Sequence, residues 1–254
     1  LNYISYAGIL GLTARKGQTP TIPGVQIADI GGGALYAAIG ILIALMGVKQ
    51  NGVGQYVDTS MLDGAVSWLA GLANDYFVKG VSPKAAENIL NGQNACYEVY
   101  ETADGRYISI GAIEPHLWAN FCDAIGKEEF KLWQRDLTKQ DEMFACLREM
   151  FKSKTQAEWI EKLTGVDCCW APVKNLEEVF ADPQVFARDM VYEMTDPAGC
   201  YGSVKMIGSA VKLSETPARQ ELFPPRKGEH NAEYLKAVGY SDEQIAEFEK
   251  NGII

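Results

Sequence analysis

The amino-acid sequence predicts an α/β protein in which a layered α/β region with a parallel sheet precedes a smaller α+β domain. The first observation is the order strand, loop, helix, strand, helix over residues 1–78, which is typical of α/β layers. The second is a hairpin pattern that begins at residue 97 and runs into helix-forming segments. The third is an ordinary globular composition, since 47% of the 254 residues are hydrophobic and 22% are charged.

The first region is expected to alternate between extended and helical segments. Its apolar stretch Leu35–Val48 is shorter than the roughly 20 residues that span a bilayer. We therefore interpret this stretch as a buried helix and expect no membrane contact. The expected elements are, in chain order, a strand at 1–12, a loop at 16–24, a helix at 34–46, a strand at 55–60 and a helical stretch at 61–78.

The second region is expected to be a hairpin followed by helices, a smaller α+β domain over about 91–200. Residues 97–102 and 107–110 form the hairpin around the turn Asp104-Gly105. The last helix of the chain is expected to open with a capping box formed by Ser241 and Gln244. The other expected elements are helices at 116–125 and within 130–163, loops at 182–184 and 196–197, a strand at 204–213 and two short helices in the tail.

Charge and residue usage argue against several classes of protein. The formal net charge is −10 with dispersed acidic residues, and no cluster of Lys and Arg predicts contact with nucleic acid. The two histidines, His116 and His230, lack the spacing of metal ligands, so we expect no metal site. The six cysteines are irregularly spaced in a chain long enough to bury a core, which favours free thiols in a reducing cytoplasm.

Asp29 is the first candidate for chemistry. It lies at the start of a helix that opens with Gly31, Gly32 and Gly33. Glycines leave backbone amides open to approach, and the positive helix end can hold a negatively charged oxygen while the carboxylate transfers a proton. The alternative is an ordinary helix cap, with glycines that permit close packing. The triple glycine has neither the P-loop nor the dinucleotide-binding spacing.

Glu114 is the second candidate. It follows the apolar strand Ile108–Ile113, and Pro115 fixes the turn after it. Functional side chains often lie where a buried strand ends in a loop. The alternative is an acid at a helix entry, with proline in the first helical position.

Four other side chains are weaker candidates for a role. The pair Cys168-Cys169 has no neighbouring histidine and is more simply a buried apolar pair than a nucleophile. His116 starts a helix, where a positive charge is disfavoured, so we expect it at the surface. Tyr97 lies on the predicted hairpin and either lines a pocket or packs.

Several segments, taken in this order, resemble CoA-transferase family III, the L-carnitine dehydratase and bile-acid-inducible group that includes α-methylacyl-CoA racemase. The resemblance covers essentially the whole chain, and the combined order is specific whereas no single motif is. The segments are 25–33 (VQIADIGGG), 54–63 (GQYVDTSMLD), 97–105 (YEVYETADG), 111–115 (GAIEP), 169–173 (CWAPV), 182–184 (DPQ), 228–230 (GEH) and 239–241 (GYS).

The resemblance implies a fold and an assembly. Part of a Rossmann-like, parallel-sheet large domain with a linker helix would occupy 1–78, an inserted small α+β domain with its preceding linker 79–200, and a return segment to the large domain 201–254. The family implies an interlocked homodimer. Each active site would lie between the large domain of one chain and the small domain of the other.

The resemblance also implies an enzyme acting on acyl-CoA thioesters. Asp29 would exchange a proton with the thioester α-carbon, and Glu114 would support the base on the opposite face. The amides of Gly31 and Gly32 would hold the enolate oxygen, while Tyr97 and Ile113 would line the substrate site. Coenzyme A enters as part of the substrate, with no tightly bound cofactor.

Three functions stay open at this point. A racemase or epimerase of 2-methylacyl-CoA leads, because Glu114-Pro115 stands where many transferases of the family carry a glycine-rich loop. Against it, Val25 replaces an asparagine expected four residues before Asp29. The alternatives are CoA transfer between carboxylic acids, and a non-catalytic fragment or half of a split enzyme. The family's Gly-His-Asp segment would fall just before Leu1, so we expect residues missing there, and the acyl group is left open.

Overall fold

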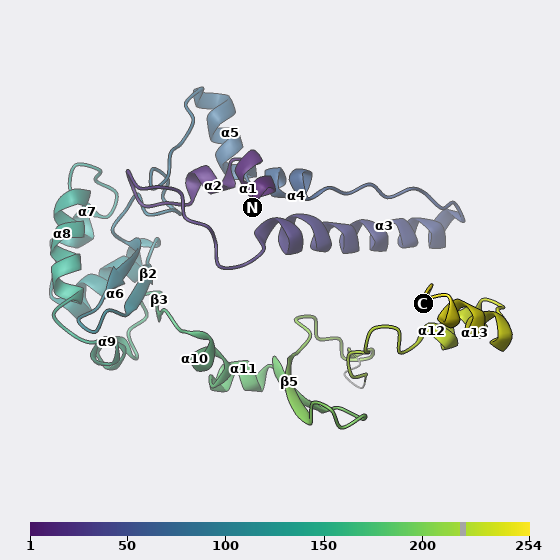
Figure 1. The fold of residues 1–254 in the computed structure, drawn as a ribbon. Coiled ribbons are helices and arrows are strands. Elements are labelled where there is room, and N and C mark those ends of the chain that lie inside the picture. Colours follow the sequence, from purple (N-terminus) through teal and green to yellow (C-terminus); the bar gives the residue numbers. More distant parts are fainter. Residues whose placement is uncertain (219–221) are drawn as a thin grey trace. The chain divides into compact units, whose positions relative to one another are not determined.

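The computed structural model describes residues 1–218 and 222–254, which form two compact units, Leu1–Val173 and Lys174–Ile254 (Figure 1). The first unit begins with a helical region and continues into an α+β region. The two units divide between Val173 and Lys174. This division does not test the predicted domain boundaries at residues 78 and 200, which stay predictions.

Every regular element of the first 90 residues is a helix. η1 and α3 run as one continuous helix from Ile27 to Asn51, so Asp29 lies in its first turn as predicted. The elements are α1 (Asn2–Tyr6), α2 (Ile9–Leu12), η1 (Ile27–Ala34), α3 (Leu35–Asn51), α4 (Met61–Ser67) and α5 (Ala70–Lys79).

Two strands predicted in this region do not form. Most of residues 1–12 folds as α1 and α2, and residues 55–60 are extended without a strand partner among the described residues. A strand is stable only where a neighbouring strand satisfies its backbone N–H and C=O groups, and the described chain offers these segments none. Both described sheets are antiparallel, so the predicted parallel sheet is not formed by the described residues.

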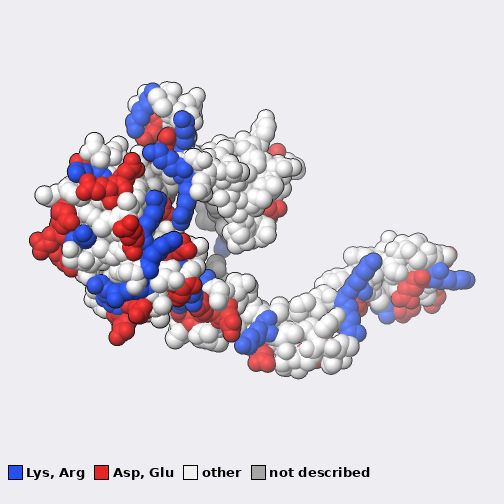
Figure 2. Space-filling model, turned by 60° about the vertical axis from the view of Figure 1, so that its left-hand side comes forward, with Lys and Arg blue, Asp and Glu red and all other residues white. Residues whose placement is uncertain are grey.

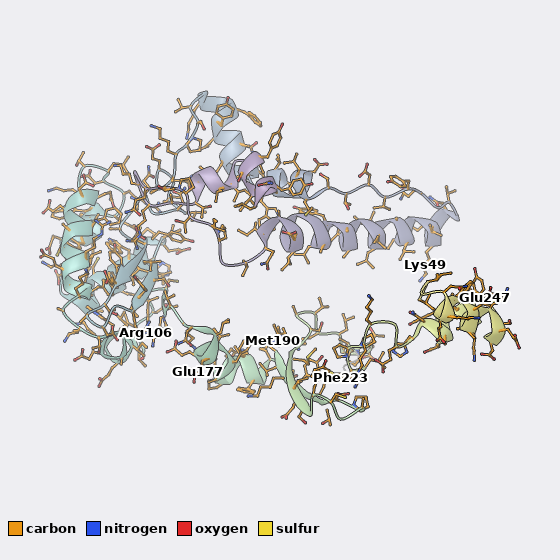
Figure 3. The ribbon with its side chains drawn as sticks, viewed as in Figure 1. Lys49, Arg106, Glu177, Met190, Phe223 and Glu247 are labelled. Carbon is orange, nitrogen blue, oxygen red and sulfur yellow. The ribbon has the colours of Figure 1, made fainter. Side chains whose placement is uncertain are left out.

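The prediction that the apolar helix is buried is wrong for this chain. Leu42 and Ile43 are each 61% exposed, and Ala44 is the buried residue of α3. Side chains project from α3 along its length up to Lys49, near its C-terminal end (Figure 3). Among the described helices, Ile27–Asn51 alone is long and apolar enough to cross a membrane, a test that core helices of soluble proteins also pass.

Glycines bring η1 against α4 at van der Waals distance. A Cβ at Gly64 would lie 1.8 Å from the carbonyl oxygen of Gly32, and a Cβ at Gly32 would lie 2.8 Å from the carbonyl oxygen of Met61. A Cβ at Gly31 would lie 2.1 Å from the ring of Trp68. The glycines after Asp29 therefore permit close helix packing, which was the simpler of the two interpretations.

The α+β region of the first unit confirms the predicted hairpin and helices. β1 and β2 pair antiparallel with Tyr97 opposite Gly111 and Glu101 opposite Tyr107, and β3 adds to the other edge of β2. The elements are β1 (Tyr97–Glu101), β2 (Tyr107–Gly111), α6 (Pro115–Ile125), α7 (Phe130–Trp133), α8 (Gln140–Phe151), α9 (Gln156–Leu163) and β3 (Trp170–Pro172).

Aromatic side chains form the core between this sheet and its helices. The fully buried ring of Phe151 stacks on Tyr100 at 4.8 Å between centroids and packs on Trp159 at 4.6 Å. The buried indole of Trp118 donates a hydrogen bond of 2.7 Å to the carbonyl of Phe130. The core is therefore large, and its polar edges are satisfied.

The second unit consists of short elements. Asp182, predicted in a loop, instead caps α11 by accepting from the amide of Gln184, because Pro183 in the first helical position favours a helix start. The predicted strand at 204–213 forms over a shorter range. Ser241 and Gln244 form the predicted capping box. The elements are α10 (Leu176–Phe180), α11 (Pro183–Ala187), β4 (Val191–Thr195), β5 (Ser203–Ile207), α12 (Asn231–Ala237) and α13 (Asp242–Lys250).

We expect Phe151→Ala to lower the free energy of unfolding of the first unit by about 3–5 kcal/mol, because it removes a fully buried ring and leaves a cavity. Urea unfolding followed by tryptophan fluorescence measures the change. Leu132→Ala, at a side chain that is 88% exposed, is the control and should change it by less than about 0.5 kcal/mol. Equal effects of the two variants would contradict this core.

We expect Gly64→Ala to destabilise the η1–α4 packing by about 1–3 kcal/mol or more, because the new methyl group overlaps the Gly32 carbonyl. Gly71→Ala is the matched control, since no atom lies within 4 Å of a Cβ there. That substitution in α5 should be neutral or stabilising by up to about 1 kcal/mol. Thermal unfolding by circular dichroism separates the two outcomes.

Candidate functional site

Glu114 lies at the junction between β2 and α6. It is the N-cap residue of α6 with Pro115 in the first helical position, yet its side chain forms no capping hydrogen bond. The carboxylate is exposed, and among the described residues no hydrogen bond or ion pair involves it. An acid at this position is therefore available to a ligand, near the positive end of a helix.

The backbone before Glu114 is held by a buried amide side chain. Gln134 is 5% exposed, and its Nε2 donates to the carbonyls of Ala112 at 3.0 Å and Ile113 at 2.9 Å. Arg135 Nη2 donates to the same Ile113 carbonyl at 2.9 Å. Sequence reasoning missed Gln134, because a glutamine in a polar helical run looks like a surface residue. Its hydrogen bonds fix the backbone that carries Glu114.

Tyr97 borders a depression on the sheet face that bears Val99, Ser109 and Ala171. The cavity volume is about 490 Å³, within the range of small-molecule sites. The ring of Tyr97 lies near Gly111, where a Cβ would be 3.8 Å from the ring atom Cε2. Gly111 begins the segment that ends in Glu114. The three residues Tyr97, Ile113 and Glu114 therefore belong to one small region of the fold.

The two adjacent cysteines differ from the predicted buried pair. Cys168 is buried, and burial raises the pKa of its thiol to about 11, which makes it a poor nucleophile. Cys169 is exposed instead, has a left-handed backbone conformation with φ 48°, and is one of the residues that line the depression. Its backbone carbonyl accepts from the amide of Gly111 at 2.7 Å. Cys169 is thus a lining residue of the depression.

Asp29 is exposed in the first turn of η1, whereas Gly31 and Gly32 are buried against α4. Amides within later helical turns donate to preceding carbonyls, so the open amides are those of the first turn. Gly31 and Gly32 therefore act through packing, and the predicted contact of their amides with a substrate stays a prediction. No described hydrogen bond or ion pair joins Asp29 to Glu114.

Charge alone does not single out another site. Acidic and basic side chains are interspersed over the face shown in Figure 2. Exposed pairs such as Lys152–Glu101 at 3.0 Å contribute little to stability. His116 is exposed, as predicted, and the described residues hold no group of three side chains able to bind a metal ion. The candidate site is therefore Glu114 with the Tyr97 depression, and Asp29 as a separate acid.

Comparison with known proteins finds both a transferase and a racemase among similar chains. An acyl-CoA transferase of Fusarium pseudograminearum is 33% identical over 98% of this chain, and the mouse α-methylacyl-CoA racemase is 32% identical over all of it. A solved CAIB/BAIF family protein of Brucella suis superposes on 93% of the chain with a TM-score of 0.74 and 26% identity. The chain spans 55%, 66% and 61% of these proteins, respectively.

The solved structure confirms a mixed α/β fold of the CAIB/BAIF type. The relatives carry names of both kinds, transferase and racemase, so similarity alone separates neither activity. The family resemblance predicted from the ordered motifs is confirmed, because the model of CoA-transferase family III matches residues 1–231. The chain therefore belongs to CoA-transferase family III.

Proposed function

We propose that the protein carrying this chain acts on acyl-CoA thioesters as a racemase or epimerase of a 2-methylacyl group. The observation that carries the proposal is the carboxylate of Glu114, which has no partner among the described residues and lies on a junction fixed by Gln134. A carboxylate that is both positioned and free can act in proton transfer or support a base. The Glu-Pro segment also differs from the glycine-rich loop that the family resemblance associates with many transferases.

Asp29 is the proposed second acid of the reaction. A proton beside a thioester is weakly acidic, so its removal requires stabilisation of the enolate oxygen and groups on both faces of the α-carbon. Asp29 would act from one face, with first-turn amides of η1 near the oxygen. The family resemblance supplies the base of the opposite face from a Gly-His-Asp segment, which Glu114 would support.

We further propose that the active unit is a homodimer in which Asp29 and Glu114 of different copies share one site. The exposed apolar surface of α3 supports this, because Leu42, Ile43 and their neighbours gain free energy when covered. A second copy is the proposed cover, rather than a membrane. All six cysteines are free thiols, which favours a reducing cytoplasm.

CoA transfer between carboxylic acids is the second candidate, favoured by the name of the Fusarium relative. It would proceed through a covalent adduct on the aspartate of the Gly-His-Asp segment. Mass spectrometry of the protein incubated with acyl-CoA distinguishes the two, because a racemase forms no such adduct. A chain with neither exchange nor adduct would be the non-catalytic fragment or half-enzyme.

We expect Asp29→Asn to slow the incorporation of solvent deuterium at the α-carbon of a 2-methylacyl-CoA by about 10²-fold or more, because an amide cannot transfer the proton. The assay uses the complete protein that carries this chain, with deuterium read by mass spectrometry. Asp63→Asn is the control, since Asp63 also lies in a first helical turn. Absence of exchange by the unsubstituted complete protein would refute the racemase proposal.

We expect Leu42→Lys to weaken self-association by about tenfold or more, because it places a charge in the covered surface of α3. Sedimentation velocity over a concentration series measures the change. Leu132→Lys, at an exposed apolar side chain outside α3, should leave association unchanged. Binding of the unsubstituted protein to phospholipid vesicles, without self-association, would point to a membrane as the cover instead.

A further inference from the structure

The connection between α7 and α8, residues 134–139, contacts the open end of the hairpin that β1 and β2 form. The backbone carbonyl of Gln134 accepts from Asn94 Nδ2 at 3.1 Å, just before β1. The side chain of Gln134 donates to the carbonyls of Ala112 and Ile113, just after β2. The connection therefore holds the entry to β1 and the exit from β2 in one fixed arrangement.

Gln140 anchors the far end of this connection. The residue is 4% exposed, and its Oε1 accepts from the amide of Ala95 at 2.9 Å. Its Nε2 donates to the carbonyls of Asp136 at 2.8 Å and Trp133 at 3.2 Å. Buried amide side chains whose hydrogen bonds are satisfied make a rigid frame. The backbone of the connection is thus fixed, and so is the starting point of each side chain that projects from it.

Arg135 extends from this connection to the backbone next to Glu114. The residue is exposed, and its Nη2 donates to the carbonyl of Ile113 at 2.9 Å. Among the described residues, that carbonyl is the one hydrogen-bond partner of the guanidinium. The carbonyl belongs to the peptide that joins Ile113 to Glu114. A hydrogen bond from a charged donor is stronger than one from a neutral amide, so Arg135 restrains this peptide.

The Ile113 carbonyl has two donors, the buried Gln134 and the exposed Arg135. A carbonyl oxygen has two lone pairs, so it can accept both hydrogen bonds. With one donor the peptide can pivot about that hydrogen bond, whereas with two its plane is fixed. The plane of this peptide sets the direction in which the Glu114 side chain leaves the backbone. Since no described hydrogen bond or ion pair holds the carboxylate itself, this peptide determines where the carboxylate lies.

We propose that Arg135 is a positioning residue for Glu114. Its hydrogen bond keeps the carboxylate in the orientation in which it supports the base on the opposite face of the α-carbon. The inference rests on the proposed function, because it takes Glu114 as the support of that base. In this account Arg135 contacts neither the substrate nor the transferred proton, and its effect passes through the backbone alone.

We expect Arg135→Ala to lower the kcat for solvent deuterium incorporation into a 2-methylacyl-CoA by about tenfold or more, because a small misplacement slows the chemical step. The assay uses the complete protein that carries this chain. KM should stay within about twofold, since contacts with the substrate are unchanged. Guanidinium chloride at a non-denaturing, millimolar concentration should raise the kcat of this variant by about threefold or more, because it supplies the same planar set of donors. Ammonium chloride lacks that planar arrangement and should have no effect.

The control variant is Arg148→Ala, which removes an exposed arginine of α8. Its guanidinium lies over the ring of Phe144, at 5.1 Å from the centroid, and forms no described hydrogen bond with residues 111–114. Because this arginine does not contact the peptide next to Glu114, kcat and the response to guanidinium should equal those of the unsubstituted protein.

Hydrogen–deuterium exchange of backbone amides measures the restraint without any catalytic step. The amide of Ile113 donates to the carbonyl of Gly111 at 3.0 Å, so its exchange reports opening of this segment. In Arg135→Ala, exchange of a peptide spanning 111–118 should be faster by about threefold or more, because the released segment opens more often. Exchange within β1 should stay unchanged, since its pairing with β2 does not involve Arg135.

Failure of the positioning role and failure of the proposed function give different results. Unchanged amide exchange at 111–118 with unchanged kcat would refute the positioning role and leave the proposed function standing. Faster exchange there with unchanged kcat would refute the positioning role together with the support assigned to Glu114. Faster exchange in β1 as well, or a loss of kcat that guanidinium does not reverse, would make Arg135 a purely structural residue. Absence of deuterium incorporation by the unsubstituted protein would remove the proposed function itself, and the positioning role with it.

Discussion

The geometry of the α+β region depends on the satisfaction of buried backbone groups between β2 and α6. The link starts buried at Ala112 and reaches the surface at Glu114, so the carbonyls of Ala112 and Ile113 need donors from the protein. Gln134 supplies them at Ala112 and Ile113, while the side chain of Gln140 accepts from the amide of Ala95 at 2.9 Å. Replacing either amide by an apolar group would leave buried polar atoms unpaired, which costs more than a hydrogen bond contributes. These hydrogen bonds fix the position of Glu114.

The helical region before it obeys a different constraint. With no strand partner among the described residues, η1 and α4 are held by a close crossing that Gly32 and Gly64 permit. The same arrangement leaves α3 with apolar side chains around most of its circumference in water. A helix that is apolar all round is stable when it is covered on all sides. The described residues therefore do not complete a hydrophobic core around α3, and further protein surface is needed to cover it.

Sequence patterns that span a few residues predicted much of the fold correctly. Prediction failed for elements that depend on partners far along the chain. The Asp104-Gly105 turn and the Ser241 capping box are encoded within a few residues, and both form as expected. The strand at 55–60 depended on partners far along the chain, which a local pattern cannot supply. Of the site, Glu114 was identifiable from its place after an apolar strand. Gln134 and the exposed Cys169 were not identifiable, because the hydrogen bonds of the one and the exposure of the other depend on tertiary contacts.

Asp29 and Glu114 are exposed to water, as is the apolar surface of α3. The proposed proton transfer and the covering of α3 are therefore connected. Carboxylates in water are well solvated, and their proton-transfer chemistry gains most when a dry, preorganised site surrounds them. Both acids lie at helix starts in the described chain, yet neither is enclosed by it. Whatever covers α3 removes water from the same region of sequence that carries Asp29, since η1 and α3 are one helix. On the proposed function and the proposed homodimer, we expect assembly and catalysis to appear together, because one helix carries both the apolar surface and the acid at its start.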